Sequence, residues 1–150
     1  MEARINELIE IAKGRISEFN NTVPPPLQGE MLEGFVNNYE LRFGESPDQS
    51  HLTFLGKCDG LYFADYKLYS GADDSRTDYC MVLSGGQDWS NMSETWADYI
   101  FFGQSSMDLY AKKKGVQEFV VLARDSDDIV ESFESYDELL LYILELMTQD

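Results

Sequence analysis

An apolar run that ends at a glycine constrains this chain more than any other feature. Residues 99–103 read Tyr-Ile-Phe-Phe-Gly, and a second short apolar run follows the stretch 104–107. Aromatic and β-branched residues on both sides of a polar connection are typical of a β-hairpin. We therefore predict a strand over residues 99–103, a turn over 104–107 and a strand over 108–112. Because the first strand is apolar on both faces, it belongs in the middle of a sheet covered by helices.

Helical spacing and capping residues predict the helices that cover this sheet. Apolar residues recur at helical spacing in residues 5–19, 32–43 and 139–147. Ser46, Pro47 and Gln49 are the types preferred at the N-cap, N1 and N3 positions, so a short further helix should begin there. Gly60 is the expected end of that helix, and a capping box at Ser135 should open the last one.

The remaining apolar runs predict the other strands. These runs are residues 61–64, 66–69, 80–83, 118–123 and 129–133. Residues 84–86 read as a turn, and residues 88–97 fit either a short helix or a loop. Helices, then strands, then a closing helix predict a single α+β domain over residues 1–150, with a largely antiparallel sheet of about five to six strands flanked by N-terminal helices and a C-terminal helix. The residues expected in its core are Leu8, Ile9, Phe35, Phe54, Ile100, Phe102, Val121, Leu139 and Ile143.

Length and cysteine content indicate a cytoplasmic domain that needs no covalent reinforcement. A chain of 150 residues can bury one core without disulfides or metals. Cys58 and Cys80 lack the CxxC spacing of a metal or redox motif, so we expect both to be free thiols. The charged, amphipathic N-terminus has no apolar signal region, and no apolar run approaches the ~20 residues that span a bilayer.

Charge narrows the class of partner. The chain carries 11 Lys and Arg against 28 Asp and Glu, a formal net charge of −17. Such a chain repels nucleic acid and anionic membranes, and it attracts basic proteins. Solubility alone is the competing explanation, although this charge exceeds the ~2–8 typical of a small domain. The three lysines 112–114 are expected to lie in a solvated turn and not to form a nucleic-acid patch.

No residue pattern indicates catalysis, a metal site or a cofactor. His51 is the single histidine, which favours a surface or packing role over a catalytic one. The chain has no phosphate-binding glycine loop and no nucleophile with a base at recognisable spacing. The adjacent aspartates at 73–74 and 127–128 are the type usually found as solvated charge on turns. They leave open, as a less favoured alternative, a hydrolase that uses carboxylates.

Two kinds of residue are candidates for binding a protein partner. Trp89 and Trp96 are seven residues apart, which puts them on one face if their segment is helical, and they would serve as core lids or as exposed anchors. Acidic residues cluster in a polar loop and in a later turn. The candidate partner-binding residues are therefore Asp73, Asp74, Asp78, Trp89, Trp96, Asp125, Asp127 and Asp128.

An ordered set of short motifs resembles a known superfamily. The set comprises Pro24-Pro25-Pro26 before a helix, Pro47 before Phe54-Leu55 and Cys58-Asp59-Gly60-Leu61, the run from Tyr99 to Ser105, Phe119-Val120-Val121-Leu122, and the ending Phe133-Glu134-Ser135-Tyr136-Asp137-Glu138-Leu139-Leu140. Over nearly the whole chain, this set is similar to the SUKH superfamily, the Smi/Knr-like domains. Cys-Asp-Gly stands here where Asn-Gly is commoner in such domains.

The resemblance implies a binding module without catalytic residues. Many bacterial members of the superfamily are thought to be immunity proteins that bind and neutralise toxins delivered between competing cells, and eukaryotic members are linked to cell-wall regulation. We accordingly expect a protein partner, most simply a basic toxin domain such as a nuclease. A scaffold or regulatory protein with an endogenous partner is the alternative.

Overall fold

The six strands among the described residues form one antiparallel meander. The structure is a computed structural model that describes residues 1–72 and 81–149. In chain order its elements are α1 (Glu2–Glu18), α2 (Glu30–Phe43), α3 (Gln49–Lys57), β1 (Leu61–Phe63), β2 (Tyr66–Leu68), α4 (Gly85–Ser90), the 3-10 helix η1 (Trp96–Asp98), β3 (Tyr99–Gln104), β4 (Asp108–Lys113), β5 (Phe119–Ala123), β6 (Ile129–Phe133) and α5 (Tyr136–Met147). The strands lie in the order β1-β2-β3-β4-β5-β6, and every neighbouring pair is antiparallel. The predicted α+β fold is confirmed.

The hairpin of β3 and β4 is the centre of the sheet, as predicted. All residues of β3 from Tyr99 to Gly103 are buried. Gly103 is required there because a Cβ at this position would lie 2.5 Å from the Lys67 carbonyl oxygen of β2. The nine residues predicted for the core are all buried, Phe102 and Ile100 among them. The apolar run therefore sets both the position of the hairpin and the close approach of β2.

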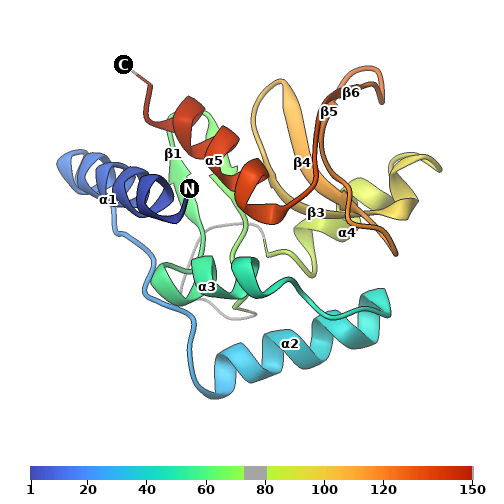
Figure 1. Cartoon of the computed structure of the whole chain (residues 1–150), viewed down its shortest axis with the longest axis horizontal. Helices are drawn as coiled ribbons and strands as arrows, with labels where there is room; N and C mark the ends of the chain where they lie inside the picture. The colour runs from blue at the N-terminus through green and yellow to red at the C-terminus, as the bar shows by residue number, and fades with distance from the viewer. Residues whose placement is uncertain (73–80, 150) are drawn as a thin grey trace.

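Helices pack on the sheet and on one another to close the core. α5 contacts α1, α3, β5 and β6, and Figure 1 shows it beside α1 with α3 below. α2 lies farther out and reaches the core through Phe35 and Tyr39. The capping box is present, because the Ser135 hydroxyl accepts a hydrogen bond from the Glu138 N–H at 3.2 Å. The Glu138 carboxylate accepts one from the Glu134 N–H at 2.9 Å.

The predicted ends of α3 are wrong. Its N-cap is Asp48, and Ser46 instead donates its hydroxyl hydrogen to the Glu40 carboxylate at 2.7 Å. α3 ends at Lys57, before Gly60, because the following residues turn to pair with the proline segment. There the Asp59 N–H donates to the Pro25 carbonyl oxygen at 3.0 Å. Contacts with distant segments thus override the local capping signals.

The segment before β3 also departs from the sequence prediction. Of residues 80–83, Cys80 lies outside the described residues, and Met81 forms one isolated bridge with Ser70 instead of a strand. Residues 84–86 are not a separate turn, because α4 begins at Gly85. The Ser84 carbonyl oxygen accepts the N–H of Asp88 at 3.1 Å, which extends the helical turn toward Trp89.

The first of the three lysines is buried, which contradicts the predicted solvated turn. Lys112 lies within β4 and is 3% exposed. Its Nζ lies 2.6 Å from Oε2 of Glu45, and the Gly115 N–H donates to Oε1 of the same carboxylate at 2.7 Å. Because Glu45 neutralises the ammonium group, the interior of the sheet can accommodate it.

Candidate functional site

Three turns meet at one end of the sheet and carry most of its described acidic candidates. They connect β1 to β2, β3 to β4 and β5 to β6, which an antiparallel meander places at the same end. The Ser106 N–H donates to the Asp65 carboxylate at 2.9 Å, and the Arg124 N–H donates to the Met107 carbonyl oxygen at 3.0 Å. We call residues 64–65, 105–108 and 124–128 the turn end. The hydrogen bonds between its turns hold it as one surface.

The turn end carries five aspartates, namely Asp65, Asp108, Asp125, Asp127 and Asp128. Partial burial raises the pKa of Asp108, and the negative charge of Asp125 adds to that effect. Hydrogen bonds from Ser106 lower the pKa of Asp65. Asp125 and Asp128 are exposed, so the two residues lie on the surface of the protein.

Arg124 is the cation within the turn end, and its side chain is held against the protein. Its guanidinium donates to the Ser105 carbonyl oxygen at 2.7 Å and lies 4.8 Å from the centre of the Trp89 ring. The Trp89 Nε1–H donates to the Tyr69 hydroxyl at 2.6 Å. With Arg124 held on Trp89, the outer surface of the turn end remains acidic.

The two tryptophans meet, but they do so from different elements. Trp89 lies in α4 and Trp96 in η1, so the two residues do not share one helix, the condition under which they would lie on one face. Their ring centroids are 6.0 Å apart and the rings meet edge-on. Trp96 is buried, as expected of a core lid, whereas Trp89 is half-buried. Only Trp89 therefore offers any surface to a partner.

One exposed methionine lies in the turn end and a second lies beside it, and sequence reasoning missed both. Met107 is 70% exposed at the tip of the β3–β4 turn, and Met92 is 67% exposed in the loop after α4. The adjacent Ser93 hydroxyl lies 3.2 Å from the Asp127 carboxylate, which ties that loop to the β5–β6 turn. The only signal in the sequence was a methionine within a polar stretch at each place. Flexible thioether side chains suit an adaptable binding surface.

The other acidic candidates cannot be placed at this surface. Asp73, Asp74 and Asp78 lie outside the described residues. Of the eight candidates, the structure brings together Trp89, Asp125, Asp127 and Asp128, and it buries Trp96 against Trp89.

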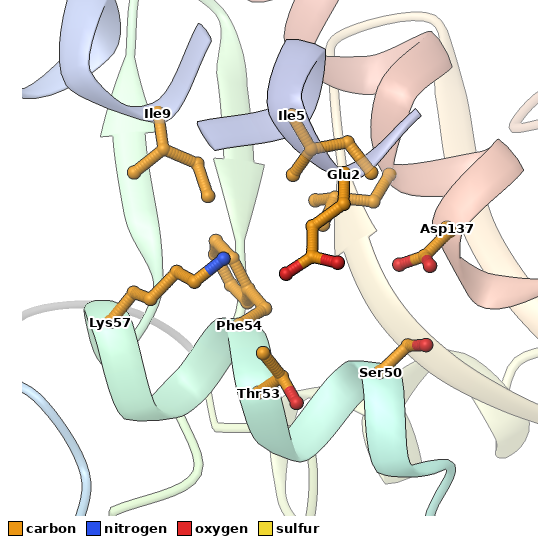
Figure 2. A pocket seen from close by; sticks show the side chains of 9 residues that line it. Glu2, Ile5, Ile9, Ser50, Thr53, Phe54, Lys57 and Asp137 are labelled. Atoms are coloured by element: carbon orange, nitrogen blue, oxygen red, sulfur yellow. The ribbon is translucent and has the colours of Figure 1, made fainter. Parts of the chain in front are cut away.

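A small pocket between α1, α3 and α5 lies away from these residues. Its volume is about 130 Å³. Figure 2 shows Glu2, Asp137 and Lys57 around it, with Ile5 and Ile9 as apolar walls. The Lys57 ammonium donates to the Asn6 side-chain oxygen. The pocket lining contains neither a histidine nor a cysteine.

The two described side chains most suited to acid–base or nucleophilic chemistry are sealed in the core. Burial lowers the pKa of His51 to about 3 and raises the pKa of the Cys58 thiol to about 12. His51 stacks on Tyr136 with ring centroids 4.8 Å apart. The packing role expected for this histidine is confirmed, and Cys58 is a free thiol.

Within residues 1–72 and 81–149, no group of three or more His, Cys, Asp or Glu residues is arranged to hold a metal ion. In the same ranges, no helix has the length and apolar character needed to cross a membrane. Neither a protein-family model nor a curated protein matches the sequence of this chain.

Proposed function

We propose that this chain is a non-enzymatic protein-binding domain, an immunity protein that binds and neutralises a basic bacterial toxin domain. The turn end supports this proposal most directly, because it places exposed aspartates next to exposed Met92 and Met107. The net charge of −17 and the resemblance to SUKH domains support it as well.

The chemistry of the turn end fits a basic protein surface. Opposite charge speeds the encounter of two proteins, and apolar side chains at the contact then slow their separation. A nuclease must bind phosphates, so its substrate groove is positively charged. An acidic surface with flexible apolar side chains can occupy such a groove and exclude the nucleic acid. A nuclease toxin is therefore the partner that this surface suits best.

A scaffold or regulatory protein with an endogenous basic partner would use the same surface. The gene neighbourhood separates the two, since an adjacent large toxin gene favours immunity. A hydrolase that uses carboxylates is the least favoured function, because Asp125 and Asp128 of the turn end are exposed. Turnover of a substrate by the purified protein would establish the hydrolase.

Co-purification from the native host, followed by a protection assay, tests the proposal. Cells that express the captured partner should lose viability, and co-expression of this chain should restore it. The double variant Asp125→Lys/Asp128→Lys should protect poorly, whereas Glu10→Lys/Glu18→Lys on α1 makes the same charge change and should protect fully. A non-toxic partner bound through the turn end would establish the scaffold instead.

A further inference from the structure

The strand β6 forms an edge of the sheet and has exposed apolar residues. Among the described residues it pairs with β5 alone. Ile129 and Val130 are each 50% exposed, and the rest of β6 apart from Phe133 is exposed as well. In an antiparallel ladder, an edge strand directs about half of its backbone N–H and C=O groups away from its neighbour. β6 therefore presents both free backbone groups and apolar side chains.

The opposite edge of the sheet is less available. β1 has three residues and contacts α1, and the Lys67 ammonium lies 4.8 Å from the centre of the Tyr62 ring. β6 has five residues, and a register shift between Val121 and Leu122 leaves Val130 as its extra residue. That bulge sets Ile129 and Val130 side by side without a residue opposite Val130.

The acidic side chains along β6 favour a basic segment as the binding partner of this edge. Asp128, Glu131 and Glu134 are exposed along and beside β6, and residues 125–150 contain no Lys or Arg. A second copy of the chain would bring the same carboxylates against each other, which disfavours a dimer through β6. A segment with Lys or Arg between apolar residues would match both the acidic side chains and the apolar pair.

We propose that β6 is a docking strand that takes up an extended basic segment of the protein partner as an additional strand of the sheet. Backbone hydrogen bonds along β6 would supply affinity, and its carboxylates would select basic side chains. The docking strand begins where the turn end finishes, so the two form one continuous surface. This inference rests on the proposed binding function, and it deepens that function by naming the form of the partner.

A short peptide of alternating lysine and valine is the probe for the docking strand. It should bind and slow hydrogen exchange at the amides of residues 129–133, because strand addition pairs some of them. The same peptide with every second amide N-methylated keeps its charge but loses one hydrogen-bonding edge. We expect it to bind at least about tenfold more weakly. Equal binding of the two peptides, or unchanged exchange in β6, would overturn the docking strand.

A pair of matched variants tests the site on the protein. Ile129→Lys/Val130→Lys should abolish peptide binding, since edge lysines repel a basic strand. Tyr62→Lys/Val116→Lys is the control, because these residues are each 47% exposed and neither belongs to β6. The control should bind the peptide normally. Equal loss in both variants, or a dimer that forms through β6, would also overturn the proposal.

The tests of the docking strand and of the proposed immunity function can give different results. If the β6 variant still captures and neutralises the partner while Asp125→Lys/Asp128→Lys does not, the binding function holds and the docking strand fails. If no partner is captured but the peptide still docks on β6, the proposed immunity function fails. The ability of β6 to take up a basic strand is then still supported.

Discussion

Lys112 and Glu45 form an ion pair that links two parts of the fold. Glu45 lies in the loop between α2 and α3, and its carboxylate binds both the Lys112 ammonium and the Gly115 N–H. Removing one partner of a buried ion pair lowers the free energy of unfolding far more than replacing both partners does. The pair should therefore behave as a unit when it is mutated.

We predict that Glu45→Ala lowers the free energy of unfolding by about 3–5 kcal/mol, because it leaves the ammonium group unpaired. The double variant Glu45→Gln/Lys112→Met should lie within about 1 kcal/mol of the unmodified protein, since the amide oxygen still accepts the Gly115 N–H. Chemical denaturation measures both. A double variant as unstable as the single one would show that the ion pair itself is needed.

His51 makes stability depend on pH. Its folded-state pKa of about 3 lies below the ordinary value of 6.5, so the unfolded chain binds more protons between these two values. Stability should therefore fall as pH drops below 6.5, by about 3 kcal/mol at pH 4 from this residue. His51→Phe fits the surrounding aromatic cluster and cannot titrate. Denaturation at pH 7 and pH 4 should show a smaller loss for the variant, and equal losses would contradict the buried neutral imidazole.

At the scale of elements, β3 places four consecutive buried side chains, Tyr99 to Phe102, in the core. Phe102 contacts His51 and Tyr136, with ring centroids 4.9 and 5.5 Å away. Truncation of a buried phenylalanine removes apolar contacts and leaves a cavity. Phe102→Ala should cost about 3–5 kcal/mol in denaturation experiments, and the same change at exposed Phe19 should cost less than about 1 kcal/mol. Similar costs at both positions would contradict the central place of β3.

The elements that sequence predicts well are those in which one local signal dominates. Apolar periodicity located α1, α2, α5 and the central hairpin because these elements bury the faces that the pattern marks. Local sequence signals gave wrong predictions where a contact with a distant segment decides the local structure. Ser46 binds Glu40 instead of capping α3, and Trp89 binds the Tyr69 hydroxyl from a helix that starts at Gly85.

The candidate site was only partly predictable for the same reason. Asp125, Asp127 and Asp128 share the β5–β6 turn, so their proximity follows from the sequence, whereas Trp89 of α4 is brought to that turn by its contact with Arg124. Met92 and Met107 carry no pattern of their own, and only the tertiary structure shows that they are exposed beside Asp127 and Arg124. The bulge that exposes Val130 likewise depends on strand register.

At the scale of the whole molecule, charge is distributed unevenly. The segment from residue 125 onward carries nine acidic residues and no basic one, and it includes the β5–β6 turn and β6. Within the same segment, α5 ends without a basic side chain of its own, and Arg15 of α1 donates to the Thr148 carbonyl oxygen there. Asp125, Asp128 and Glu131 of this segment are exposed, so part of its acidic charge lies on the surface at the turn end and β6.

This distribution predicts how association with a basic partner should respond to mutation and salt. Asp125→Lys/Asp128→Lys should slow association strongly and change dissociation less, because exposed charge mainly governs the rate of encounter. Glu10→Lys/Glu18→Lys, with the same net charge, should slow it much less. Raising salt to 1 M shortens the Debye length to about 3 Å and should bring the unmodified protein and both variants to similar association rates. Surface plasmon resonance with the captured partner measures these rates. Equal slowing by both variants at low salt would mean that net charge alone steers the encounter and that the turn end has no special part in it.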